Sequence, residues 1–232
     1  MAQIHLVRHS YALIRHWIRR TGKRGDLLDE AELQRVTGAS RTEVREALGA
    51  LAMDGLVDRR RRAGTQLESQ IADVSIDLPV AYEAAEQEQY RHVVLRPSTV
   101  AATPILCDTF GGPAEEFFLT EDSRIELNGA PLALRTSFWR GSERRRPTPV
   151  GIENADLAQT FHAAFNTELA ECDAHIDTLR ASERLAARLK ITAGQPVLLR
   201  EAVLTGRDGL VHEVAYTYYA GSRTSLHLKT QY

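Results

Sequence analysis

Two arginines four residues apart stand in the segment SRTEVREAL at residues 40–48. Ser40 is suited to cap a helix, and Glu43 completes the S-x-x-E pattern in which each side chain bonds the other residue's backbone. An apolar stripe then recurs at helical spacing, at Val44, Ala47, Leu48 and Leu51. We therefore expect an amphipathic helix that buries this stripe and turns Arg41 and Arg45 outward. Arginines in that position can donate hydrogen bonds to guanine or to phosphate, although an ordinary solvated helix face has the same composition.

The neighbouring segments predict two further helices in front of this one. The first is expected at about His9–Thr21, ending at Gly22. The second has Asp29 as its N-cap and ends at Gly38, one residue before the Ser40 cap. Short helices joined so tightly are typical of a helix-turn-helix, whose second helix enters the DNA major groove.

A basic hairpin is expected after the third helix stops at Asp54-Gly55. LVDRRRR and TQLE flank the turn and predict two short strands, which together would form a wing. The arginine run at residues 59–62 is by itself typical of a solvated surface, but beside this helix-turn-helix we favour phosphate contacts.

The residues LLDEAELQRVTGASRTEVREALGALAMDGLVDRRRRAGTQL, 27–67, resemble the winged helix-turn-helix of the GntR family of bacterial transcription regulators. The resemblance places Arg41 and Arg45 in the major groove and the tip of the wing in the adjacent minor groove. The DNA-binding residues that it implies are Ser40, Arg41, Thr42, Glu43, Arg45, Arg60, Arg61, Arg62, Gly64 and Thr65.

Three positions depart from the family pattern. Glu43 replaces a threonine that touches DNA, and either it serves as the capping acid, which we favour, or it accepts a hydrogen bond from cytosine. Ala31 stands where many relatives carry a polar or basic residue, so one contact is expected to be missing. Arg62 replaces the first glycine of the wing.

The second half predicts strands with helices inserted. One hairpin is expected around Asn128-Gly129, a strong type I′ turn signal, and a second around the RDG turn at 207–209. NADLAQTFHAAF and ASERLAARL predict amphipathic helices, the latter capped by Ser182. This arrangement indicates an α+β fold built on an antiparallel sheet.

The residues LKITAGQPVLLREAVLTGRDGLVHEVAYTYYAGSR resemble the UTRA effector-binding domain found in the HutC-type branch of GntR regulators. The resemblance implies a chorismate-lyase-like fold, a homodimer and a small-molecule effector, with no other cofactor. It places Arg135, Ser137, Glu213, Tyr219 and Arg223 toward the effector. Alternation predicts that Arg135 shares a face with Ser137, and Glu213 with Tyr219. Structural ion pairs of Arg135 with an acid, or of Glu213 with Arg223, remain open alternatives.

The expected organisation is a DNA-binding domain at 1–68, a linker at 69–89 and a UTRA domain at 90–232. Residues 1–70 carry 13 basic against 9 acidic side chains, which suits binding of an anion such as DNA. The chain has no long apolar run and two cysteines outside any C-x-x-C, so we expect a cytoplasmic protein with reduced thiols, away from membranes.

These features favour a DNA-binding repressor that a small, anionic metabolite releases from its operator. One alternative is a constitutive regulator whose second domain only dimerises. Another is an enzyme on the lyase-like fold, but the sequence lacks a P-loop, G-x-S-x-G, G-x-G-x-x-G and H-E-x-x-H. Its histidines form no compact ligand set, so we expect no bound metal and no catalysis.

Overall fold

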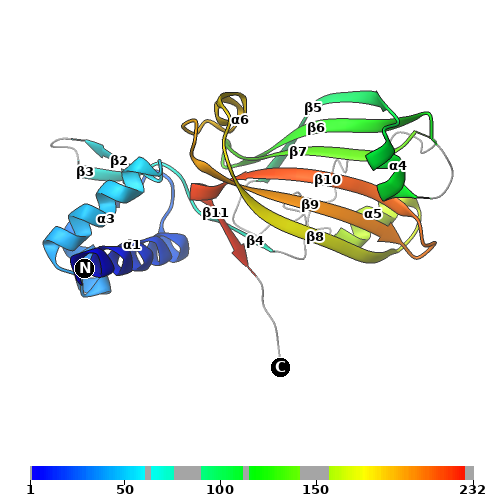
Figure 1. Cartoon of the computed structure of the whole chain (residues 1–232). Helices are drawn as coiled ribbons and strands as arrows, with labels where there is room; N and C mark the ends of the chain where they lie inside the picture. The colour runs from blue at the N-terminus through cyan, green and yellow to red at the C-terminus, as the bar shows by residue number, and fades with distance from the viewer. Residues whose placement is uncertain (1, 61–63, 76–89, 112–114, 142–156, 228–232) are drawn as a thin grey trace. The chain divides into compact units, whose positions relative to one another are not determined.

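The computed structural model describes residues 2–60, 64–75, 90–111, 115–141 and 157–227 (Figure 1). Contacts divide the chain into two units. The first unit is Met1–Asp73 with Ser222–Ser225, and the second is Val74–Gly221 with Leu226–Tyr232. Among the described residues, no helix combines the length and the apolar character needed to cross a membrane.

Three helices build the first unit: α1 (Ala2–Thr21), α2 (Glu30–Thr37) and α3 (Arg41–Met53). The Asp29 side chain caps α2, and Gly38 ends it with φ 68°, a left-handed conformation that glycine adopts without strain. The predicted helix-turn-helix is therefore confirmed. The first helix starts seven residues earlier than the expected His9, because residues 2–8 contain no glycine or proline to stop it.

The wing is a three-stranded antiparallel sheet. Strand β2 (Val57–Arg60) pairs with β3 (Gly64–Leu67), as the sequence predicts. A short strand that the sequence does not reveal, β1 (Leu27–Leu28), pairs with the other edge of β3, so the order is β1-β3-β2. This pairing joins the wing to the start of the helix-turn-helix.

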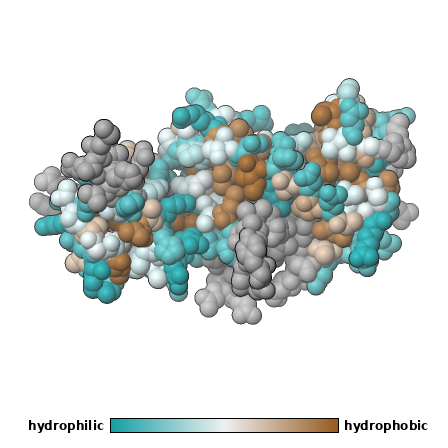
Figure 2. All heavy atoms as spheres, turned by 60° about the horizontal axis from the view of Figure 1, so that its bottom comes forward, coloured by the Kyte–Doolittle hydropathy of each residue, from teal (hydrophilic) through white to brown (hydrophobic). Residues whose placement is uncertain are grey.

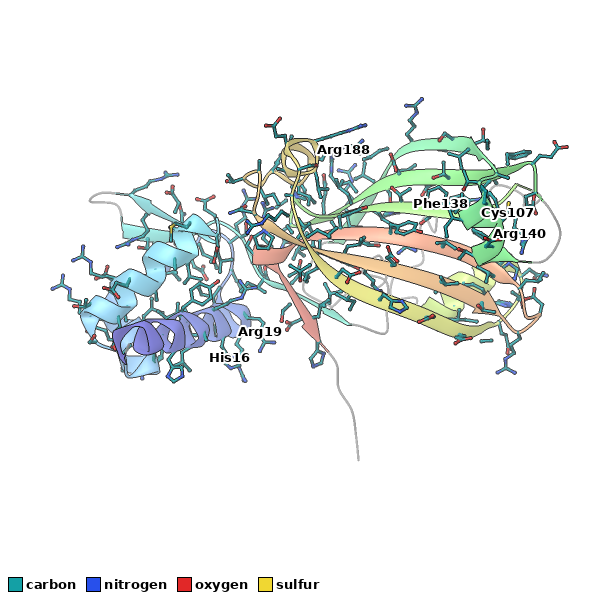
Figure 3. The ribbon with its side chains drawn as sticks, viewed as in Figure 1. His16, Arg19, Cys107, Phe138, Arg140 and Arg188 are labelled. Carbon is teal, nitrogen blue, oxygen red and sulfur yellow. The ribbon has the colours of Figure 1, made fainter. Side chains whose placement is uncertain are left out.

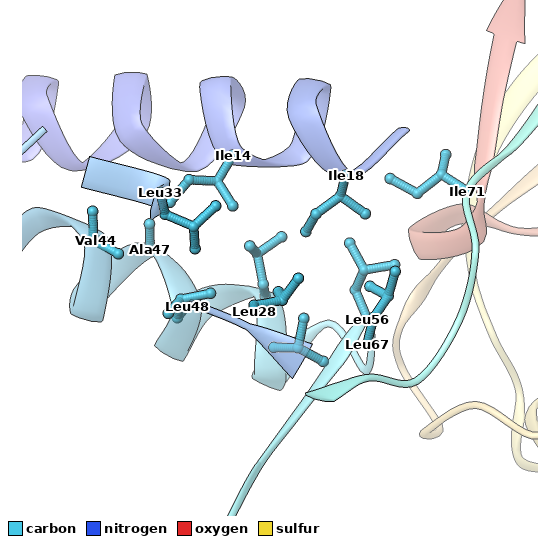
Figure 4. Packing of buried hydrophobic residues seen from close by; sticks show 12 residues of the cluster. Ile14, Ile18, Leu28, Leu33, Val44, Ala47, Leu48, Leu56, Leu67 and Ile71 are labelled. Carbon is cyan, nitrogen blue, oxygen red and sulfur yellow. The ribbon is translucent and has the colours of Figure 1, made fainter. Parts of the chain in front are cut away.

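The core of the first unit lies between the helices and the wing (Figure 4). Each of the four apolar residues predicted on α3 is fully buried. Ile14 and Ile18 of α1 pack against them, together with Leu67 of the wing. Tyr11 holds α1 to the end of α3, since its hydroxyl donates to Asp54 Oδ2 at 2.6 Å. Burial and this hydrogen bond raise the pKa of Tyr11 to about 12.

The second unit is built on a six-stranded antiparallel sheet of order β5-β6-β7-β10-β9-β8. Its strands are β5 (Tyr90–Ala101), β6 (Phe117–Leu127), β7 (Ala130–Arg140), β8 (Leu169–Arg180), β9 (Pro196–Gly206) and β10 (Val211–Ala220). Both predicted hairpins are present, β6–β7 and β9–β10. Asn128 and Gly129 have φ of 51° and 76°, the pair of positive values that a type I′ turn requires. The α+β class is confirmed.

Helices cover both faces of this sheet (Figure 1). On one face, α4 (Pro104–Phe110) packs on Phe118 and Val214, and α6 (Glu183–Leu189) packs on Leu134 and Val197. On the other face, Phe161 of α5 (Leu157–Phe165) packs on Leu204. A short 3-10 helix, η2 (Gly221–Arg223), follows β10, and β4 (Ala72–Ser75) and β11 (Thr224–His227) form a two-stranded sheet.

A buried arginine fastens α4 to the sheet (Figure 3). Arg140 of β7 donates to the carbonyl oxygens of Phe110 and Gly111, both at 2.8 Å, and its guanidinium lies 5.6 Å from the centre of the Phe110 ring. These bonds satisfy carbonyls at the end of α4, so Arg140 has a structural role.

Candidate functional site

The N-terminus of α3 has the reciprocal cap that the sequence predicts. The Ser40 amide donates to Glu43 Oε2 at 2.7 Å, and the Glu43 amide donates to Ser40 Oγ at 3.4 Å. The bond from the Ser40 amide is the main reason that the pKa of Glu43 lies below its ordinary value. Glu43 is therefore engaged in the cap in this structure.

Arg41 and Arg45 are exposed on α3, outside its buried stripe. Their side chains are 73% and 58% exposed, so both are accessible to a ligand from solvent. Ser40 and Thr42 at the start of the helix are also exposed, and Ala31 on α2 is exposed without a polar group. The structure thus places the predicted residues of α3 on one accessible surface.

One carboxylate lies among the arginines. Glu30, the first residue of α2, is 3.8 Å from Arg41 Nε, 3.9 Å from Arg45 Nε and 4.0 Å from Arg59 Nη2. Arg59 of β2 also donates to the carbonyl oxygen of Arg45 at 3.1 Å, which ties the wing to α3. The sequence does not reveal that Glu30 and Arg59 lie beside Arg41 and Arg45. They meet because α2 packs on α3 and β2 pairs with β3.

The wing residues differ in what they offer. Arg60 is exposed but bonds Asp58 at 2.6 Å. Arg61 and Arg62 lie outside the described residues. Gly64 is exposed with φ 90°, whereas Thr65 is 6% exposed and lies between β1 and β2. The Thr65 side chain is therefore buried in this structure, in the central strand of the wing sheet.

A second polar cluster lies in the sheet of the second unit. Arg135 Nη2 donates to Glu213 Oε1 at 2.8 Å, and Arg135 Nε donates to Ser137 Oγ at 2.9 Å. The side chains of Arg135 and Glu213 are 8% and 2% exposed. Of the alternatives that the sequence leaves open, the ion pair between Arg135 and a neighbouring acid is thus the one that forms.

The strand register shows that these residues share one face with others. Directly paired residues point to the same side of a sheet, and Arg135 pairs with Thr217, which pairs in turn with Arg200. Arg200 is 3% exposed, and its Nη2 lies 3.8 Å from Cys172 Sγ. Burial raises the pKa of that thiol. The next row on this face contains Ser137, Ala215 and Ala202.

Two arginines therefore flank a threonine on the face that carries Glu213 and Tyr219. Arg200 is missing from the residues expected from the sequence, because only the alignment of β9 with β10 and β7 brings it beside Arg135. Tyr219 is 1% exposed, in keeping with a core position.

Arg223 occupies a different environment. It lies in η2 and is 9% exposed. Residues 222–225 belong to the first unit by their contacts. There Arg15 donates to the carbonyl oxygens of Ser222 and Thr224, at 2.8 and 3.3 Å. Burial, followed by the charge of Arg24, lowers the pKa of Arg223. Arg135 and Arg200 are the buried arginines that share the face of the second cluster.

The first unit is a winged helix-turn-helix, a class of DNA-binding module, with a capped second helix that exposes two arginines. Residues 6–67 match the family model of bacterial regulatory proteins, gntR family, and residues 85–225 match the UTRA domain. The chain belongs to the UTRA-domain regulators of the GntR family: it is a transcriptional regulator with a DNA-binding domain and an effector domain.

This chain is similar in sequence to a known regulator and in structure to solved regulators. An uncharacterized HTH-type transcriptional regulator of Rhizobium meliloti (strain 1021) is 22% identical over 205 residues, which cover 87% of this chain and 84% of that protein. The crystal structure of PhnF from Mycobacterium smegmatis has a TM-score of 0.65 at 21% identity, covering 96% of this chain and 99% of PhnF. YydK from Bacillus subtilis, a possible transcriptional regulator, has a TM-score of 0.54 at 16% identity over 97% of this chain and 99% of its own. The structural similarity supports the fold.

Proposed function

We propose that α3 reads the major groove of an operator through Arg41 and Arg45, with phosphate contacts from Ser40, Thr42 and the wing. The observation that carries this proposal is the exposure of both arginines on a capped helix directly beside a paired basic wing. Arginine can donate two hydrogen bonds to guanine O6 and N7, so one such side chain discriminates a base by about 1–3 kcal/mol.

Selection of binding sequences from random duplex DNA tests this proposal and supplies an operator. Arg45→Ala should weaken binding to the selected duplex by about 1–3 kcal/mol and relax one base position. Arg41→Ala combined with Arg45→Ala should abolish the preference for that duplex. Arg184→Ala combined with Arg188→Ala removes two arginines at the same spacing from α6 of the second unit, and it should leave the preference intact. Unchanged operator binding by the α3 double variant would show that this helix does not read DNA.

We propose further that the chain is a cytoplasmic repressor of the HutC type, released from its operator by a small anionic metabolite. Arg135 and Arg200 support an anionic ligand, because guanidinium groups donate paired hydrogen bonds to carboxylate or phosphate. Ser137 and Thr217 add hydroxyls on the same face. The small side chains of Ala215 and Ala202 lie in the same row as Ser137, next to the row of Arg135, Thr217 and Arg200.

A homodimer is part of this proposal. Strands β5 and β8 are the edges of the six-stranded sheet in the described part of the chain, and each is 12 residues long. Apolar side chains are exposed in this unit, among them Ile105, Phe117 and Leu179 at 69%, 40% and 41%. Apolar areas interrupted by hydrophilic ones are visible in Figure 2. Long edges and exposed apolar groups favour association with a second copy.

A panel of sugar phosphates and di- and tricarboxylates tests the effector proposal by release of the protein from its selected duplex. A typical coupling of about 1–3 kcal/mol would weaken DNA binding roughly 5- to 150-fold. Arg200→Gln should keep operator affinity and lose the response to the active compound. Arg207→Gln, which breaks an exposed pair with Glu168, should keep the response. If no compound of this panel releases the protein, the proposal of an anionic effector is wrong, in agreement with a purely structural Arg135–Glu213 pair. If no metabolite of any class releases it, the second domain only dimerises.

A further inference from the structure

One acidic side chain stands within the basic surface that we assign to DNA. Glu30 is the first residue of α2, and its carboxylate lies within 4.0 Å of guanidinium nitrogens from α3 and from the wing. Two of these arginines, Arg41 and Arg45, are the proposed readers, and the third, Arg59, bonds the backbone of Arg45. The carboxylate therefore faces DNA-binding elements that are separate in the sequence.

The position of Glu30 is itself well defined. Asp29 caps the helix by accepting from the amides of Ala31 and Glu32, which fixes the first turn. An acid in that turn is further stabilised by the positive end of the helix dipole. With a side chain 32% exposed, Glu30 is also less solvated than Arg41 and Arg45. A partly buried carboxylate on a capped helix turn thus meets two more exposed arginines.

We propose that Glu30 is a specificity-determining residue that orients Arg41 and Arg45 for base reading and lowers non-specific attraction to DNA. Three like charges that converge on one surface repel each other, and the carboxylate between them offsets that repulsion. Separations of 3.8–4.0 Å in a partly exposed site correspond to weak ion pairs, which a phosphate or a base edge can replace. The site therefore preorients the arginines without locking them.

The consequence for recognition follows from the two kinds of contact. Phosphate contacts attract any DNA in proportion to positive charge, whereas base contacts require a defined side-chain direction. Loss of the Glu30 charge should thus strengthen binding to any sequence and weaken the advantage of the operator. This inference rests on the proposed reading role of α3.

The test compares Glu30→Gln with Glu32→Gln in the full-length protein. Both variants remove one negative charge from α2, but Glu32 pairs with Arg35 and not with the readers. Affinity is measured for the duplex selected with wild-type protein and for a random-sequence duplex of equal length, at several salt concentrations. Thermal melting checks that both variants are folded.

We expect Glu30→Gln to bind random DNA several-fold more tightly and to lose about tenfold in its operator-to-random affinity ratio, whereas Glu32→Gln keeps the wild-type ratio. Addition of Glu30→Gln to the Arg41→Ala and Arg45→Ala double variant should change the ratio no further, since residues that act as a unit are not additive. An equal ratio for Glu30→Gln and Glu32→Gln would overturn the inference. Failure of wild-type protein to prefer any sequence would instead overturn the proposed DNA reading.

Discussion

The sequence leaves two alternative roles open for each of two side chains, Glu43 and Arg135. Glu43 could have been a base reader, but its carboxylate accepts from the Ser40 amide, which is one of the free amides at the start of α3. Arg135 could have faced an effector alone, but it pairs with Glu213 inside the sheet. In both cases the charged group forms a hydrogen bond with a nearby partner in the protein, so a ligand has to compete with that partner.

A capping role for Glu43 predicts that Glu43→Gln keeps the base preference of the wild-type protein, as measured by selection on random DNA. The amide oxygen of glutamine can still accept from the Ser40 amide. Because the folded-state pKa of Glu43 is lowered, its carboxylate contributes stability above its ordinary pKa, and this contribution is lost as pH falls through the folded value.

The melting temperature should therefore be slightly higher for wild type than for Glu43→Gln at neutral pH. The difference should shrink as pH falls below the ordinary glutamate pKa of about 4.3, and it should vanish once pH has passed through the lower folded-state value. Glu43→Ala, which removes the acceptor of the Ser40 amide but keeps the bond to Ser40 Oγ, should melt lower than either across the range. A changed base preference for Glu43→Gln would favour the reading role.

Elements follow from local signals where the signal is strong. The N-caps Asp29, Ser40 and Ser182 begin their helices as expected, and Asn128-Gly129 forms the predicted turn. The strand β1 cannot be predicted from the sequence, because two residues are too few to show a periodicity. Only its pairing with β3 defines it. Short elements of this kind depend on their neighbours.

Opposite effects are expected from alanine at two glycines. Gly129 has φ 76° and open space where a Cβ would lie, so Gly129→Ala should cost about 1 kcal/mol through backbone strain alone. Gly49 lies inside α3, where an added Cβ would meet only Arg59 Nη1 at 3.6 Å. Gly49→Ala should stabilise the first unit by about 0.5–1 kcal/mol through helix propensity. Calorimetric unfolding measures both, and effects of equal sign would contradict this account of the turn.

At the scale of the whole molecule, the proposal requires two DNA-binding units acting together. If each protomer of a dimer neutralises about four phosphates, the logarithm of the binding constant should fall against the logarithm of salt concentration with a slope near −7. A single protomer would give about half that slope. Titration of the selected duplex at several salt concentrations, with the mass of the complex measured by sedimentation, distinguishes these cases.

The sequence by itself determines the helix-turn-helix, its caps, the wing strands, the two hairpins of the second unit and the alternation of their faces. These features depend on capping residues, on the spacing of apolar residues and on turn residues. They can therefore be predicted from residues that are close together in the sequence. The resemblance of residues 27–67 and of residues 189–223 also suffices to indicate the family that the matches to residues 6–67 and 85–225 show.

Only the tertiary structure decides which charged groups meet. Glu30 reaches the arginines of α3 because α2 packs on α3, and Arg200 joins the face of Arg135 because β10 lies between β7 and β9. Arg223, which the resemblance places toward the effector, lies in η2, and its contacts group it with the first unit. Electrostatic partners are set by separations of a few ångströms between residues far apart in the chain, and sequence spacing contains no information about those distances.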